Sequence, residues 1–357
     1  MFKNRIERLS RVIEEHEADA ALITTTENIF YFTGLTGMWN TTSPTRLIVS
    51  RDTHLLVTVR MEEERVKMET GFEPITIRKD VVIDDEAASI LKGLKAKTLL
   101  FDSISPDILE KFRKEFEGVR FIGSKILELR SVKSREEIEV MRKSAEITAK
   151  TLKKAKEFIQ PGVRECDVAA EMEYHARKQG AEGVSFPTLV ASAERSSLPH
   201  GASTQKKIPD DTAILVDFGA RYRGYSSDFT RTYLLGNPPK RHLELVKAVM
   251  EAYRRSAEKI RAGTDANEAY EEAVKTFREL GLDERFLHSL GHGVGISVHE
   301  LPVLSWKKRF LQRGNVVTVE PGLYIPGFGG VRVEDTVLVK EDHIEPLAML
   351  EHELFIP

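Results

Sequence analysis

The sequence lacks the features that direct a protein to the cell surface or into a membrane. Cys166 is the single cysteine among 357 residues, so no disulfide can form within the chain, as is usual in reducing compartments. The first residues, Met1–Arg8, are charged and contain no apolar segment of the kind found in signal peptides. No stretch approaches the roughly 18 consecutive apolar residues of a membrane-spanning helix. We therefore expect a cytoplasmic protein with no membrane partner.

A strong net charge of either sign is also lacking. The chain has 53 Lys and Arg against 56 Asp and Glu, which gives a formal net charge of −3. Because no overall basic field attracts the protein to nucleic acid, we expect no nucleic-acid partner. Hydrophobic residues make up 41% of the chain, enough for a substantial core. The length suits one large domain or two ordinary ones.

Several catalytic signatures are missing as well. The sequence has no G-x-S-x-G nucleophile elbow, no H-E-x-x-H zinc motif and no Walker phosphate-binding loop. The glycine-rich segment Gly291–Gly295 lacks the flanking strand and helix of a phosphate-binding loop. Cys166 falls in an expected helix, where packing is a simpler interpretation than nucleophilic catalysis.

The first part of the chain, residues 1–124, alternates helical and strand patterns. An amphipathic helix is expected at Ile6–Glu17, and strands are expected at residues 20–23, 45–49, 55–59 and 98–101. This mixed order predicts an α/β domain with a sheet flanked by helices.

A second domain is expected at residues 125–357. Ser134–Glu137 has the form of a capping box and opens a long helix that should end near Ile159, before Pro161 and Gly162. Helices then alternate with hairpin-like segments to the end of the chain, which predicts an α+β domain.

Two aspartates lie in the segment VDFGARYRGYSSDFTRTY, which begins at Val216. Apolar runs on both sides predict a hairpin. If the turn is centred on Tyr222 and Arg223, Asp217 lies opposite Asp228. Such aspartates are commonly turn residues or surface charges, but facing carboxylates repel each other and need an explanation.

A second acid pair lies in VVTVEPGLYIPGFGGVRVEDTVLV. Glu320 and Glu334 occupy two strand-like runs whose midpoint is Gly327, so these glutamates also come face to face. Alternation places Arg332 and Thr336 on the same face as Glu334.

Histidines fall between and before the two acid pairs. HSLGHGVGISVHE supplies His288, His292 and His299, and SSLPHG supplies His200. Four acids in apolar strands cannot all be buried as charges without a heavy desolvation cost. Divalent cations neutralise such carboxylates, and four carboxylates with one imidazole suit two metal ions that share bridging oxygens.

These motifs together resemble those of the pita-bread metallopeptidases, the family that includes methionine aminopeptidase, aminopeptidase P and proline dipeptidase (prolidase). The resemblance rests on DFG, SDFTRT, GHGVG, VEPG and GVRVED in that order. It implies a pita-bread catalytic domain over residues 125–357. It also implies five metal ligands, which are Asp217, Asp228, His292, Glu320 and Glu334. TENIFYFTGL, which begins at Thr26, resembles the creatinase/prolidase N-terminal domain, so residues 1–124 are expected to form it.

Within this family the chain is most similar to the Xaa-Pro dipeptidases, with Xaa-Pro aminopeptidase as the alternative. The resemblance implies hydrolysis of the Xaa-Pro bond of dipeptides by a hydroxide that bridges two metal ions. It also implies roles for further side chains. Glu320 would carry protons as well as bind metal. His200 and His299 would hydrogen-bond the substrate and stabilise the tetrahedral intermediate, and His288 would be a further active-site histidine. Arg332, beside Glu334 on the same face, would orient a metal-binding acid or form a structural ion pair.

The types of donor atom limit which metal ions are expected to bind. One imidazole and four carboxylates without thiolate favour Mn²⁺ or Co²⁺, with Zn²⁺ or Fe²⁺ as alternatives. The resemblance further implies a proline-containing peptide as substrate and a homodimer.

Two other classes share this architecture. Creatinases hydrolyse small amidines and do not keep the metal ligands, whereas this chain keeps all five. Some relatives bind partners without cleaving peptides, and the intact ligand set argues against that function too. Two departures from the family pattern, Leu301 after Glu300 and Ala193 in place of a glycine, lie near the expected cleft and bear on substrate preference.

Overall fold

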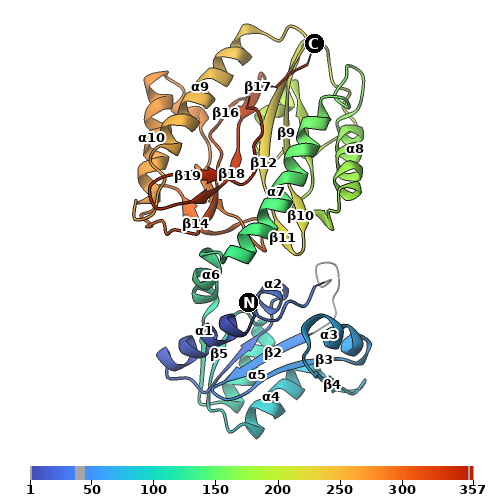
Figure 1. The fold of residues 1–357 in the computed structure, drawn as a ribbon, viewed down its shortest axis with the longest axis vertical. Coiled ribbons are helices and arrows are strands. Elements are labelled where there is room, and N and C mark those ends of the chain that lie inside the picture. Colours follow the sequence, from blue (N-terminus) through green and yellow to red (C-terminus); the bar gives the residue numbers. More distant parts are fainter. Residues whose placement is uncertain (1, 37–44, 353, 357) are drawn as a thin grey trace. The chain divides into compact units, whose positions relative to one another are not determined.

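The structure is a computed structural model that describes residues 2–36, 45–352 and 354–356. The chain divides into two compact units, Met1–Arg130 and Ser131–Pro357. The domain boundary expected at residues 124 and 125 falls inside helix α6 (Gly123–Ser131), at the end of the first unit. Figure 1 shows both units in ribbon form.

The first unit is built on a six-stranded sheet with the order β4-β3-β2-β1-β5-β6. Strand β1 (Ala20–Ile23) pairs antiparallel with β2 (Thr45–Ser50) and parallel with β5 (Thr98–Phe101). The remaining strands are β3 (His54–Val59), β4 (Ile75–Ile77) and β6 (Gly118–Phe121). The four expected strands are therefore present. The sequence missed the two edge strands, β4 and β6, which are only partly buried or exposed and lack the continuous apolar run of the strands that were predicted.

Helices of this unit connect the strands and cover the sheet. They are α1 (Phe2–Glu15), α2 (Thr26–Thr33), α3 (Glu63–Thr70), α4 (Ile83–Gly93) and α5 (Pro106–Glu115). The first begins before the expected Ile6 and ends before the expected Glu17, because Glu17 takes a left-handed φ of 49°. Leu22, Leu91 and Phe112 belong to the buried core between helices and sheet.

The second unit opens with helix α7 (Arg135–Ala155), which has the predicted capping box. The Ser134 side chain accepts a hydrogen bond from the Glu137 amide, and the Glu137 carboxylate accepts one from the Ser134 amide. The α-helix ends before the expected Ile159, because the chain tightens into i→i+3 hydrogen bonds at residues 157 and 158.

Strands and helices of the second unit enclose the acidic segments. The helices after α7 are α8 (Glu165–Lys178), α9 (Lys240–Ala257) and α10 (Ala266–Glu279). In Figure 1, α9 and α10 lie on one side of the strands of this unit, and α7 and α8 lie on the other. Among the described residues, no helix is both long and apolar enough to cross a membrane.

Strands of two sheets carry or flank the acids. The first has the order β20-β12-β9-β8 and consists of β8 (Leu189–Ser192), β9 (Thr212–Phe218), β12 (Phe229–Leu235) and β20 (Leu354–Ile356). The second has the order β14-β13-β15-β18-β19 and consists of β13 (Gly291–Gly293), β14 (Glu300–Leu304), β15 (Val316–Val319), β18 (Asp335–Val339) and β19 (Ile344–Pro346). Smaller sheets are formed by β7 (Gly183–Val184), β10 (Ala220–Tyr222) and β11 (Tyr225–Ser226), and by β16 (Gly322–Ile325) and β17 (Gly329–Arg332).

Candidate metal centre

The first pair of acids lies on the hairpin that contains β9 and β12. Asp217 pairs with Thr230, so the prediction that Asp217 lies directly opposite Asp228 is wrong. The turn is formed by Arg223 and Gly224, whose left-handed φ values of 45° and 77° suit a two-residue hairpin turn. Its centre is one residue later than predicted, which shifts the register by two. Because side chains alternate with a period of two, both aspartates still point to the same face as diagonal neighbours.

The second pair of acids lies on a long hairpin made of β15, β16, β17 and β18. Its two ladders, β15 with β18 and β16 with β17, share one register that is centred on Gly327. Glu320 and Glu334 lie between the two ladders and therefore face each other, as predicted. Arg332 and Thr336 share the face of Glu334, as the alternation predicted.

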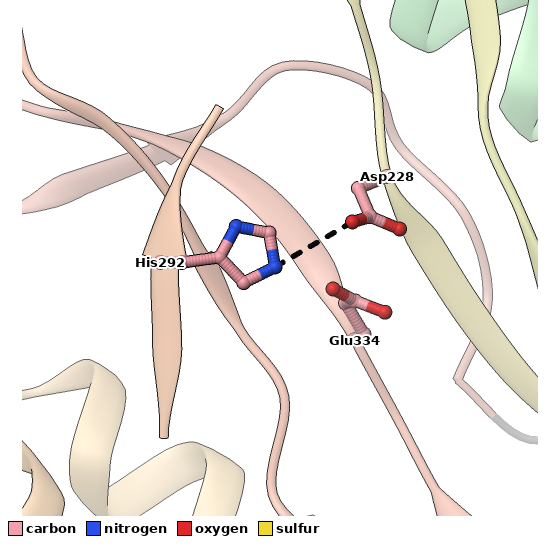
Figure 2. A group of neighbouring side chains, drawn as sticks. All are labelled: Asp228, His292 and Glu334. Atoms are coloured by element: carbon pink, nitrogen blue, oxygen red, sulfur yellow. Dashed lines mark ion pairs between the residues drawn. The ribbon is translucent and has the colours of Figure 1, made fainter. Parts of the chain in front are cut away.

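His292 lies on strand β13 and completes a group of side chains that could hold a metal ion. Ligand atoms of Asp228, His292 and Glu334 all lie within 4.8 Å of one another, and Figure 2 shows the three side chains pointing toward one another. The Nε2 atom of His292 lies 3.6 Å from Asp228 Oδ2 and 3.4 Å from Glu320 Oε1. Its Nδ1 atom donates a hydrogen bond of 3.1 Å to the Gly293 carbonyl, so the Nε2 lone pair of the neutral ring faces the carboxylates.

Burial makes these charges unfavourable without a cation. Asp228 and Glu334 are 5% and 2% exposed, and burial, followed by the charges of neighbouring carboxylates, raises the pKa of both well above the usual range. Burial also raises the pKa of Glu320 and lowers the pKa of His292. The site thus disfavours charge on the acids unless a cation lies between them, and it keeps the imidazole neutral, the form that binds a metal ion.

Unpartnered oxygens give a direct test of whether a metal fits. Oδ1 of Asp217 and Oδ1 of Asp228 are buried, and neither has a hydrogen-bond partner among the described residues. Buried polar atoms normally have a partner, because an unpaired one costs about 1–3 kcal/mol. Carboxylate oxygens and an imidazole nitrogen are suitable ligands for divalent cations. The residues present therefore fit divalent metal ions.

Arg332 fixes the position of one acid. The residue is 3% exposed, and its guanidinium forms an ion pair of 2.7 Å with Asp217 Oδ2. The same group donates hydrogen bonds to the Thr230 and Tyr324 hydroxyls, at 3.0 and 2.7 Å. The acid that Arg332 pairs with is thus Asp217 across the hairpins, and not the neighbouring Glu334.

Sequence reasoning placed Thr336 on the face of Glu334 but assigned no role to it or to two other threonines whose hydroxyl groups hold the acids. Thr230 donates a hydrogen bond to Glu334 at 2.6 Å, Thr318 donates one to Glu320 at 3.1 Å, and Thr336 donates one to the Asp228 carbonyl at 2.6 Å. Each of these threonines also lies two residues along the chain from one of the acids, and therefore on the same face as that acid. The period-two alternation was the available signal. The bonds to Glu334 and Glu320 orient carboxylates, and the bond to the carbonyl holds the backbone of Asp228.

The other predicted histidines surround this cluster. His288 lies 4.0 Å from Glu320 Oε2 and accepts a hydrogen bond from the Tyr324 hydroxyl, with a separation of 2.9 Å. The ring of His299 lies 4.1 Å from the ring of His292, centroid to centroid. Partial burial, and then the neighbouring His292, lower the pKa of His299 to about 4.

His200 lies on an exposed loop that lines a cavity. The cavity has a volume of about 600 Å³ and is also lined by Leu198, Pro199, Leu287 and His288. His200 therefore shares this cavity with His288, whose Nδ1 atom lies 4.0 Å from Glu320 Oε2. The cavity therefore connects His200 with a histidine that lies beside the acid cluster.

Comparison with known proteins identifies relatives along the whole chain. The model of metallopeptidase family M24 matches residues 139–341, and that of the creatinase/prolidase N-terminal domain matches residues 5–132. A Xaa-Pro dipeptidase of Pyrococcus furiosus is 37% identical over 99% of this chain and 100% of its own.

Solved structures of similar proteins also match the whole chain. A prolidase from Pyrococcus horikoshii OT3 superposes with a TM-score of 0.92 at 33% identity, and covers 98% of this chain and 99% of its own. An X-Pro aminopeptidase from Thermotoga maritima MSB8 superposes with a TM-score of 0.91 at 34% identity, over 99% of both chains. The pita-bread fold predicted for the second unit is confirmed by these neighbours. The acid cluster therefore belongs to a metallopeptidase, and the chain is a member of metallopeptidase family M24 with a creatinase/prolidase N-terminal domain.

Proposed function

We propose that this metallopeptidase hydrolyses the Xaa-Pro bond of dipeptides with two divalent metal ions. The ligands would be Asp217, Asp228, His292, Glu320 and Glu334. The observation that carries the proposal is the cluster of facing, buried carboxylates in which two oxygens have no partner among the described residues. The names of the dipeptidase and prolidase relatives support the substrate class. The donor set favours Mn²⁺ or Co²⁺.

When bound, metal ions of this kind make hydroxide available near neutral pH and polarise the peptide carbonyl. The side chains of the protein position the other reactants. Glu320 takes the proton of the attacking water and passes it to the leaving proline nitrogen. Arg332 holds Asp217 in place through the 2.7 Å ion pair. His200 and His299 donate hydrogen bonds to the substrate carbonyl as negative charge develops on its oxygen.

Dipeptides of the Xaa-Pro type are expected to be cleaved faster than Xaa-Pro-Yaa peptides. The aminopeptidase alternative remains relevant, because an X-Pro aminopeptidase superposes about as well as a prolidase. Steady-state kinetics with matched Xaa-Pro and Xaa-Pro-Yaa substrates, together with a peptide that lacks proline, test both functions. A higher kcat/KM for the longer peptides would favour the aminopeptidase, and cleavage of neither proline peptide would contradict the proposal.

His200→Ala is expected to lower kcat by roughly 10²–10³, the range for loss of one donor to a developing oxyanion. The interaction strengthens in the transition state, so the effect should fall mainly on kcat. Metal content should not change, because His200 lies outside the ligand set. Metal analysis and kinetics on one preparation provide the measurement. Loss of metal would make His200 a ligand, and a normal kcat would make it structural.

A cytoplasmic location and a homodimer complete the proposal. The single cysteine supports a reducing compartment, and the family resemblance supports the dimer.

A further inference from the structure

We propose that Glu165, at the start of helix α8, is a positioning residue that holds the loop carrying His200 in its active form. The inference rests on the function proposed above, because the loop matters through His200. The loop runs from Ser192, at the end of strand β8, to Thr204. Glu165 is 0% exposed and lies outside the acid cluster.

The Glu165 carboxylate accepts hydrogen bonds from both ends of the loop. At the first end, Oε1 accepts from the amide and the hydroxyl of Ser192 at 2.8 and 2.9 Å. At the other end, Oε2 accepts from the amide and the hydroxyl of Thr204 at 3.2 and 2.6 Å. A single buried carboxylate therefore joins two points that lie twelve residues apart in the sequence.

Arg195 extends this contact into the middle of the loop. Its Nε atom donates to Glu165 Oε2 at 3.0 Å, and its Nη2 atom donates to the Ala202 carbonyl. The guanidinium thus connects the carboxylate to a residue two positions from His200. The charge of Arg195 also compensates the buried charge of Glu165, which would otherwise be costly.

The same loop also contacts the metal-binding hairpin. Arg332 Nη1 donates to the Pro199 carbonyl at 3.2 Å, and the Gly330 amide donates to the Ser196 hydroxyl at 2.8 Å. Glu165 and Arg332 therefore hold the loop at separate points, with His200 next to the second contact. Without Glu165, the Ser192 and Thr204 amides and the Arg195 guanidinium lose a shared acceptor, so the loop should become mobile and His200 misplaced.

Glu165→Gln tests the inference, because glutamine keeps the shape of the side chain but loses the charge and offers donors where acceptors are needed. We expect kcat for an Xaa-Pro dipeptide to fall by about 10–10², the scale of a 1 Å misplacement of a catalytic group. KM and metal content should change little. Glu171→Gln, an exposed position on the same helix, is the matched control and should behave as wild type.

A double-mutant cycle separates positioning from general destabilisation. If Glu165 acts through His200, adding Glu165→Gln to His200→Ala should cause no further loss of kcat. If the fold losses of kcat from the two single substitutions multiply in the double variant, or if Glu165→Gln alone leaves kcat unchanged, the inference is overturned. Thr204→Val removes one donor to the carboxylate and should give a smaller loss of kcat in the same cycle, which keeps the test available if Glu165→Gln fails to fold.

Hydrogen exchange tests the same contact without any assay of activity. In Glu165→Gln the amides of residues 192–204 should exchange faster than in wild type, while helix α7 keeps its protection. Unchanged exchange in this loop would overturn the inference even if the enzyme cleaves Xaa-Pro. Failure of the proposed function would instead be seen in the unmodified protein, as an absence of Xaa-Pro hydrolysis.

Discussion

Asp228→Asn is expected to abolish peptide hydrolysis while leaving the fold largely intact. Asparagine has nearly the same shape, and the hydrogen bonds between Thr336 and the backbone of residue 228 do not involve the carboxylate. The substitution removes one anionic ligand from the group formed with His292 and Glu334. At least one metal ion should therefore bind weakly, and the hydroxide that it supplies should be lost.

The fold should tolerate this change, because the charge of Asp228 is unfavourable in the protein without metal. Burial and the charge of Glu334 both raise the pKa of Asp228, and asparagine carries no charge to bury. Turnover, metal content and circular dichroism on one preparation give the measurement, with Asp210→Asn, at an exposed position of the same unit, as the control. Full metal content with normal turnover would contradict the assignment of Asp228 as a ligand.

The two acid-bearing hairpins differ in how well the sequence predicts them. The one centred on Gly327 is symmetric about a glycine with a left-handed φ of 75°, so the facing of Glu320 and Glu334 could be predicted by counting. In the other hairpin the turn residues are Arg223 and Gly224, and placing the turn one residue early gave the wrong partner for Asp217. The error did not affect the predicted site, because a register shift of two preserves the face of every side chain.

Contacts between elements were harder to predict than the acids themselves. The position of Arg332 on the face of Glu334 follows from alternation, but its ion pair with Asp217 depends on how two hairpins pack. Glu165 gave no signal in the sequence, because a glutamate in the first turn of a helix is common for reasons of the helix dipole. Its contacts with Ser192 and Thr204 depend on both ends of the loop lying at the same carboxylate in the folded protein, and local sequence patterns do not show this.

Removal of metal by a chelator is expected to stop turnover reversibly and to lower the melting temperature. The physical reason is that the facing carboxylates repel one another when no cation lies between them, so bound metal stabilises the native state by mass action. At a free metal concentration 100 times Kd this contribution is about 2.7 kcal/mol. For a unit of this size the melting temperature should then fall by roughly 5–10 °C.

Calorimetry with and without chelator, followed by addition of metal, gives the measurement. The Asp228→Asn protein is the internal control, because a site that has already lost a ligand should respond to chelator with a smaller shift in melting temperature. Turnover should return when Mn²⁺ or Co²⁺ is added back to the wild-type protein and should not return in the variant. An unchanged melting temperature after complete metal removal would mean that the four acids lie too far apart to share cations, and the proposed ligand set would then be wrong.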